Sequence, residues 1–134
     1  AYRSLPSDRM SRSPVYLSTY LSRLMRSGLR MAKAVVPAAQ RALQAAGISA
    51  SDCAVIKTHN PFAVNDVYFA RELGIEAESF NNNGSSLIYG HPQAPTGARL
   101  IAEAIAEARL NRGGYILFAG CAAGDTAAAL VLKA

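Results

Sequence analysis

The sequence predicts an α/β domain in which a mixed sheet has helices on its faces. Segments with helical spacing of apolar residues alternate along the chain with short apolar runs that are typical of strands. The last two apolar runs are separated by one short loop, which indicates a hairpin closing the sheet. Polar and reactive side chains follow the ends of these runs, where open α/β sheets place their sites.

The composition indicates one globular domain with a substantial core. The 134 residues are 51% hydrophobic and only 17% charged, which argues against disorder. No apolar run approaches the roughly 20 residues that span a bilayer, and the arginine-rich start does not resemble a secretory signal. Two cysteines without zinc-like spacing argue against a disulfide scaffold or a metal site. We therefore expect a cytoplasmic protein that is not embedded in a membrane.

The positive charge is concentrated at the N-terminal end. Residues 1–33 carry a net charge of +6, whereas the remainder carries −1. The basic end contains no recognisable nucleic-acid-binding motif, so we expect a solvated or partner-facing segment and no nucleic-acid partner. We divide the chain into a basic segment of loop and short helix over residues 1–31 and a domain over residues 32–134. Because the chain starts at Ala1, we expect it to be the later part of something longer.

The first half predicts three helices and one strand. Leucines at helical spacing indicate a short helix over residues 15–27, and a longer helix is expected over residues 32–46. Pro37 favours a start of the regular part nearer Val36. A continuous apolar run over residues 53–56 is typical of a strand buried on both faces. A helix over residues 63–73 follows, with its apolar face expected to include Val64 and Val67.

The second half predicts the remaining strands around one long helix. Residues 85–89 are expected to form a strand, and Thr96 to cap a helix over residues 97–111. Strands are predicted over residues 115–119 and 127–132, joined by a tight loop over residues 120–126.

Two residues in this half are candidates for chemistry. His91, one of two histidines, lies between Gly90 and Pro92, and Cys121, one of two cysteines, lies among small residues after a strand. Each has a plainer interpretation, the histidine as part of a turn and the cysteine as a small buried hydrophobe. Their order, with a helix between them, favours acid–base or thiol chemistry.

Four motifs occur in a fixed order over residues 32–134: Val36-Pro37-Ala38-Ala39, His59-Asn60-Pro61-Phe62, Asn83-Gly84 followed by Gly90-His91-Pro92 and Thr96-Gly97-Ala98-Arg99, and finally Cys121. This region resembles the C-terminal domain of thiolases, the acyl-CoA acyltransferases. The His-Asn-Pro-Phe motif is most similar to the version found in thiolases of the sterol-carrier-protein type.

The resemblance implies specific roles for three catalytic residues. His91 would activate the acyl-accepting nucleophile and donate a hydrogen bond to a thioester oxygen. Cys121, with its pKa lowered by a neighbouring imidazole, would remove the α-proton of an acetyl group. His59 would help to form an oxyanion hole. We therefore expect His59, His91 and Cys121 to converge at one end of the sheet. Support for the loops would come from Asn60, Gly90, Ala123 and Gly124.

The resemblance also implies partners. The substrate would be a coenzyme A thioester, in thiolysis or reverse condensation, with no bound cofactor or metal. A thiolase N-terminal half would supply the nucleophilic cysteine, and this chain alone would be inactive. We expect a homo-oligomer, with another chain covering the helix over residues 38–46 or the face around Ala104 and Ala108.

Some residues depart from the thiolase pattern. Ala123 and Asp125 replace the two glycines that follow the family's cysteine, and Asn60 replaces a carboxylate. Two alternatives therefore stay open, a degenerate thiolase-like retro-aldolase and a non-catalytic subunit that binds partner chains.

Overall fold

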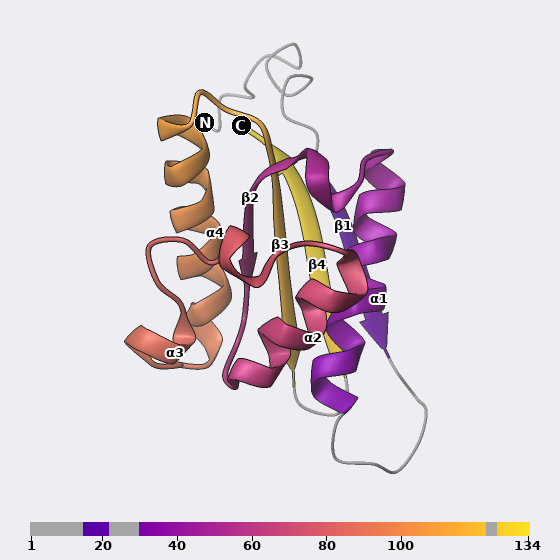
Figure 1. The fold of residues 1–134 in the computed structure, drawn as a ribbon, viewed down its shortest axis with the longest axis vertical. Helices are drawn as coiled ribbons and strands as arrows, with labels where there is room; N and C mark the ends of the chain where they lie inside the picture. The colour runs from indigo at the N-terminus through magenta and orange to yellow at the C-terminus, as the bar shows by residue number, and fades with distance from the viewer. Residues whose placement is uncertain (1–14, 22–29, 123–125) are drawn as a thin grey trace, which may run out of the picture.

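The computed structural model describes residues 15–21, 30–122 and 126–134. Within them the strands form a single four-stranded mixed sheet with the order β1-β4-β3-β2 (Figure 1). β2 and β3 are parallel, whereas β4 runs antiparallel to both β3 and β1. The strands are β1 (Val15–Leu21), β2 (Cys53–Thr58), β3 (Tyr115–Ala122) and β4 (Thr126–Lys133).

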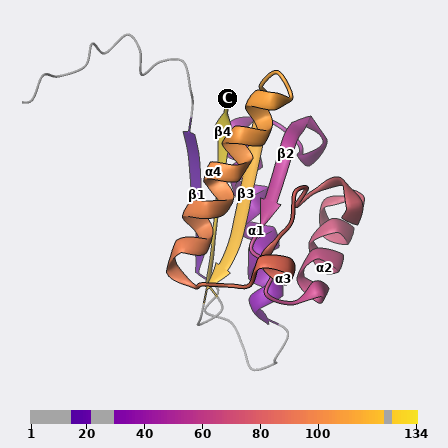
Figure 2. The same ribbon diagram turned by 90° about the vertical axis from the view of Figure 1, so that its left-hand side faces the viewer.

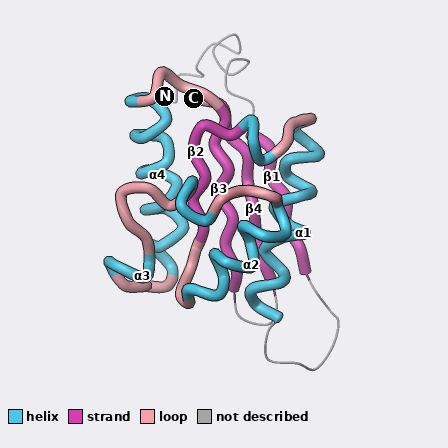
Figure 3. Tube along the Cα trace, in the orientation of Figure 1, coloured by secondary structure: helices cyan, strands magenta, loops and turns pink. Residues whose placement is uncertain are grey.

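Helices cover both faces of the sheet, as predicted. α1 packs against β1, β3 and β4 with α2 beside it, and α4 packs against β2 and β3 on the opposite face (Figures 2 and 3). None of the helices in the described part of the chain is long and apolar enough to cross a membrane. The helices are α1 (Arg30–Ala46), α2 (Ala63–Leu73), α3 (Ser86–Tyr89) and α4 (Ala94–Leu110), with 3-10 turns η2 (Ala50–Asp52) and η3 (Ala77–Ser79).

The alternation of side chains along β3 supplies two cores. Leu117 and Ala119 belong to the larger core, which α1 and α2 complete. Ile116 belongs to a smaller core under α4, together with Ala104 and Ala108. Because both of these alanines are fully buried against the chain's own sheet, the expectation that another chain covers them is wrong. The same holds for the alanine-rich face of α1, whose buried members include Ala38, Ala39 and Ala42.

Two of the predicted elements are wrong in type. The segment expected to begin a helix at residue 15 forms β1, which pairs with β4 as an added strand. The expected strand over residues 85–89 is the short helix α3, whose N-cap Ser85 accepts a hydrogen bond from the Leu87 N–H at 3.3 Å. This helix lies between Gly84 and Gly90, both with positive φ, so the chain turns away from the sheet at each end.

Several boundaries also differ from the prediction. α1 begins at Arg30 and contains Pro37 in its interior. α4 begins at Ala94, so Thr96 lies inside the helix and does not cap it. β3 continues to Ala122, which places Cys121 on a strand where a loop was expected.

The apolar face of α2 is also rotated from the predicted one. Phe69 and Ala70 are buried, whereas Val64 and Val67 are exposed. Among the described residues, the exposed large apolar side chains on or next to α2 and α3 are Phe62, Val64, Val67, Leu87, Ile88 and Tyr89, and Leu110 at the end of α4 is exposed as well.

Candidate active site

The structure brings His59, His91 and Cys121 together at the carboxyl ends of β2 and β3. His59 directly follows β2, and its N–H extends the parallel ladder by donating to the Ala119 carbonyl at 2.9 Å. Its Nδ1 lies 3.6 Å from the Cys121 Sγ, and its Nε2 lies 3.1 Å from the His91 Nδ1. The predicted convergence of the three residues is therefore observed.

Each residue of this group is positioned by a different element. The parallel register of β2 and β3 places His59 beside Cys121, because the carboxyl ends of parallel strands meet at one sheet edge. His91 lies in the connection between α3 and α4. Gly90 ends α3 with φ +82°, a conformation that favours glycine, and its N–H donates to the Ser86 carbonyl at 3.0 Å.

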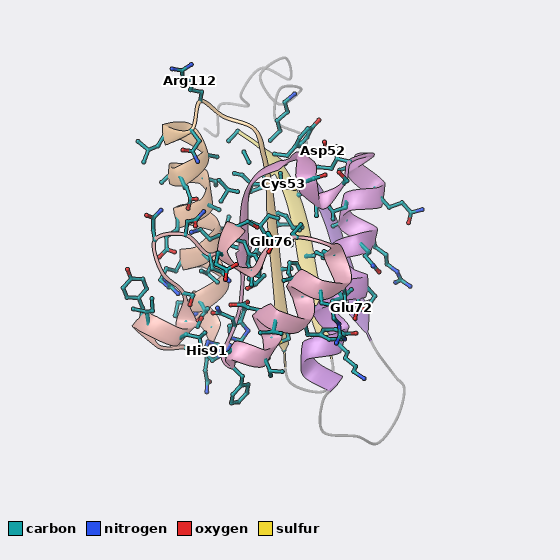
Figure 4. All side chains as sticks on the ribbon, viewed as in Figure 1. Asp52, Cys53, Glu72, Glu76, His91 and Arg112 are labelled. Atoms are coloured by element: carbon teal, nitrogen blue, oxygen red, sulfur yellow. The ribbon has the colours of Figure 1, made fainter. Side chains whose placement is uncertain are left out.

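Hydrogen bonds orient the two imidazoles. The His91 Nδ1 lies 2.8 Å from the Thr96 Oγ1, and the His59 Nδ1 lies 3.3 Å from the Cys121 carbonyl oxygen. The ring centroids are 4.1 Å apart with planes tilted by 42°. His59 is buried and Cys121 half-buried. His91 is exposed (Figure 4). The group therefore leads from the interior to the surface.

The surroundings favour the neutral forms of His59 and Cys121. Burial lowers the pKa of His59 from its ordinary 6.5, and the neighbouring His91 lowers it further, while the hydrogen bond to Cys121 opposes both. Burial also raises the pKa of the Cys121 thiol. The expectation of a lowered thiol pKa is therefore wrong, since the effect of burial outweighs that of a backbone hydrogen bond, which lowers the pKa.

Asn60 supports the loop that leads to His91. Its side chain is buried, accepts a hydrogen bond from the Ser86 N–H at 3.1 Å and donates to Asp66. The Asp66 carboxylate also accepts from the Thr58 hydroxyl at 2.7 Å and from the Asn81 amide at 3.3 Å. This network ties the end of β2 to α2 and to the start of α3.

The other cysteine is remote from the group. Cys53 begins β2 at the opposite end of the sheet from His91 (Figure 4). Burial is the main cause that raises its pKa to about 11, with a smaller contribution from Asp52. Ala123, Gly124 and Asp125 lie outside the described residues. Within the described part, no three His, Cys, Asp or Glu side chains are grouped so that they could hold a metal ion.

A family model described as "Thiolase, C-terminal domain" matches residues 6–134. This chain belongs to the thiolase C-terminal domain family.

Relatives and solved structures agree with this thiolase assignment. The chain is 41% identical to a 3-ketoacyl-CoA thiolase of Photobacterium profundum and 40% identical to one of Escherichia coli, in each case over 69% of this chain. It spans 25% of the length of both relatives.

Two solved thiolases share the fold over 90% of this chain. The structure of human mitochondrial 3-ketoacyl-CoA thiolase in complex with CoA matches with a TM-score of 0.77 and 26% identity, over 29% of its own length. The structure of the Acat5 thiolase from Ascaris suum in complex with coenzyme A matches with a TM-score of 0.79 and 21% identity, over 30% of its length.

Sequence reasoning missed two polar contacts, one at the candidate site and one elsewhere in the domain. Thr96 was interpreted as a helix cap, although its hydroxyl contacts His91. Lys57 lies within an apolar run, and its side chain is fully buried 2.8 Å from Glu107. The signal for both was a polar side chain in an apolar segment, which must find a partner when it is buried.

Proposed function

We propose that this chain supplies the acid–base half of a thiolase active site acting on acyl-CoA. Cys121 removes the α-proton of an acetyl thioester in condensation, or returns a proton to the leaving group in thiolysis. His91 activates the acyl-accepting nucleophile and donates a hydrogen bond to a thioester oxygen. His59 contributes to an oxyanion hole. The observation that carries this proposal is the grouping of the three side chains, in which His59 lies within hydrogen-bond reach of both His91 and Cys121.

The chemistry requires such a group. An α-proton of a thioester becomes acidic only when the enolate oxygen meets fixed donors, and one such donor is typically worth about 3 kcal/mol. An exposed His91 can reach a substrate, while its Nδ1 is held by Thr96. The half-buried sulfur of Cys121, which contacts His59, can exchange a proton with the same substrate.

A coenzyme A thioester is the proposed substrate. Support comes from the similarity to the human mitochondrial 3-ketoacyl-CoA thiolase, which was solved in complex with CoA. We further propose that a thiolase N-terminal half provides the nucleophilic cysteine, and that the complete protein is a homo-oligomer. The apolar side chains exposed on α2 and α3, next to His91, support a covering partner at this face.

Two finer assignments rest on single observations. The His59-Asn60-Pro61-Phe62 motif supports a site of the sterol-carrier-protein type, in which an imidazole replaces an asparagine amide. The raised pKa of Cys121 favours the second candidate function, a degenerate thiolase-like retro-aldolase, because a weakly ionised thiol is a poor base.

The test is 3-ketoacyl-CoA thiolysis by a polypeptide that joins this chain to a thiolase N-terminal half. Replacing Cys121 by Ala or His91 by Ala should each lower kcat by at least about 100-fold. His59→Asn should lower it less, because the amide keeps a donor. Unchanged thiolysis in the Cys121→Ala and His91→Ala variants would overturn the proposal. Cleavage of an aldol substrate without thiolysis would favour the retro-aldolase.

A further inference from the structure

An unbroken line of hydrogen-bond contacts joins four side chains, which are half-buried Cys121, buried His59, exposed His91 and buried Thr96. The line begins at the Cys121 Sγ, 3.6 Å from the His59 Nδ1, and crosses that ring to Nε2, 3.1 Å from the His91 Nδ1. It ends at the Thr96 Oγ1, 2.8 Å from the same nitrogen. Cys121 does not contact His91 through any of these bonds. A proton leaving the sulfur for His91 therefore has to cross His59.

We propose that His59 and His91 form a two-imidazole relay that carries the proton of Cys121 to the exposed side of the site. His59 is then a proton carrier as well as an oxyanion donor, and Thr96 is a positioning residue. The relay rests on the proposed function for its purpose, which is to create the thiolate that acts as base. Its test does not depend on that function.

The proton transfers balance in two steps that need no other reactant. At rest, the Cys121 thiol donates to the His59 Nδ1, and the His59 Nε2–H donates to the His91 Nδ1. The S–H bond breaks as an N–H bond forms at the His59 Nδ1, and the His59 Nε2–H bond breaks as one forms at the His91 Nδ1. His59 ends neutral in its other tautomer, while Cys121 becomes a thiolate and His91 an imidazolium.

Each N–H bond that this transfer creates already faces an acceptor. The new His59 Nδ1–H lies 3.3 Å from the Cys121 carbonyl oxygen. The His91 Nδ1 lies 2.8 Å from the Thr96 Oγ1 and 3.1 Å from the His59 Nε2, so its single new N–H is shared between these two acceptors. Both new N–H groups therefore lie within hydrogen-bond distance of an acceptor.

The neighbouring charged groups are held by other partners. Asp66 on α2 accepts from Thr58 and Asn60, and Lys57 on β2 pairs with Glu107 on α4. In the described part of the chain, the hydrogen bonds of Asp66 and the ion pair of Lys57 are made with groups other than the two imidazoles. We therefore expect the imidazoles to exchange protons with each other. The lowered pKa of His59 fits a carrier that passes a proton on and does not store it.

Alkylation by iodoacetamide tests the relay in the 134-residue chain without substrate, because the thiolate is the species that reacts. The variant is His91→Asn, whose side-chain amide occupies roughly the place of Nδ1 and cannot accept a proton. The relay predicts that the Cys121 rate at pH 7 falls at least about tenfold. Cys53, at the other end of the sheet, should react at an unchanged rate and reports on folding.

A direct thiol–His59 pair predicts the opposite sign. Because His91 lowers the pKa of His59, removing it should make His59 a stronger base and speed alkylation of Cys121. A Cys121 rate within about threefold of the unmodified chain, or a faster one, would overturn the relay.

A second measurement needs no variant. The ¹⁵N chemical shifts of the histidine rings at pH 7 should show His59 protonated at Nε2 and not at Nδ1. The Nδ1–H tautomer at His59 would also overturn the relay, since Nδ1 could not then accept the thiol proton. If the relay fails while the thiolysis variants lose activity, the proposed function stands without it.

Discussion

The Nζ of Lys57 lies 2.8 Å from the Oε2 of Glu107, and this links the carboxyl end of β2 to the last turn of α4. The Lys57 side chain is fully buried, and its ammonium also donates to the Asn82 carbonyl. The Glu107 carboxylate accepts from the Asn82 and Asn83 amides at 3.4 and 3.2 Å. One ion pair therefore anchors the loop that precedes α3 and leads to His91.

Breaking this pair on one side should be costly. Lys57→Met leaves the Glu107 carboxylate beside apolar side chains, and we expect the free energy of unfolding to fall by about 3–5 kcal/mol. The combined variant Lys57→Met, Glu107→Leu should recover much of that loss, because no charge is left buried. Urea unfolding of the single and double variants measures both values. Equal losses in the single and double variants would contradict a buried, coupled pair.

The stability of the domain should depend on pH through His59. Its pKa is lowered in the folded state, so the unfolded chain takes up a proton first as the pH falls below 6.5. The free energy of unfolding should therefore be fully present above pH 6.5 and decrease as the pH falls from there toward the folded-state pKa. Denaturant titrations between pH 5 and 8 provide the measurement, and His59→Asn should make the profile flatter. An identical slope in that variant would assign the effect elsewhere.

Gly120 leaves room for the site. A Cβ at this position would lie 3.1 Å from the Phe118 Cζ and 3.3 Å from the His59 Cβ, which is tighter than ordinary packing. Gly120→Ala should therefore cost about 1–3 kcal/mol and displace His59.

Gly97→Ala is the matched control for this change. Its Cβ would lie 3.6 Å from the same Phe118 ring atom, an ordinary contact. This variant should stabilise the domain by about 0.5–1 kcal/mol, because alanine is the better helix former. Thermal unfolding of the two variants should show shifts of opposite sign, and equal shifts would contradict the packing argument.

The Asp66 network should hold the loop that carries His91. Asp66→Ala leaves buried donors of Asn60 and Thr58 without an acceptor, and we expect a loss of about 1–3 kcal/mol. Amide exchange between residues 81 and 91 should become faster. Glu72→Ala removes an exposed partner of Arg71 on the same helix and should change stability by less than about 0.5 kcal/mol. Slow exchange retained in the Asp66 variant would show that the loop is held by other contacts.

The sequence predicted the layers of the domain because strands buried on both faces form continuous apolar runs and the helices that cover them have apolar residues at helical spacing. The helices α1, α2 and α4 and the strands β2, β3 and β4 were all expected, α2 with the predicted bounds and the others with shifted ends. The error at β1 arose because Leu17, Leu21 and Leu24 have helical spacing. Residues 15–21 are rich in β-branched and aromatic residues, and they pair with the edge of β4 that β3 does not occupy. Local spacing does not reveal this long-range contact.

The reactive side chains were easier to predict than the bonds between them. His59 directly follows β2 and Cys121 lies near the carboxyl end of the parallel neighbour β3, so their meeting depends only on topology. The Thr96 contact depends on where α4 begins, and the Lys57 pair depends on which helix covers β2. Periodicity gives no information on either point. The raised pKa of Cys121 results from burial, which likewise depends on the packed structure.

The most direct test of the central claim is the rate of Claisen condensation of acetyl-CoA by Cys121→Ser and by its matched control Cys53→Ser. Both would be measured in the polypeptide joined to a thiolase N-terminal half. A hydroxyl ionises at a far higher pH than a thiol, so Cys121→Ser should nearly abolish condensation while leaving the melting temperature close to that of the unmodified protein. Cys53→Ser should retain the condensation rate and lose some stability. Condensation at the unmodified rate in Cys121→Ser would make this cysteine structural and contradict the account.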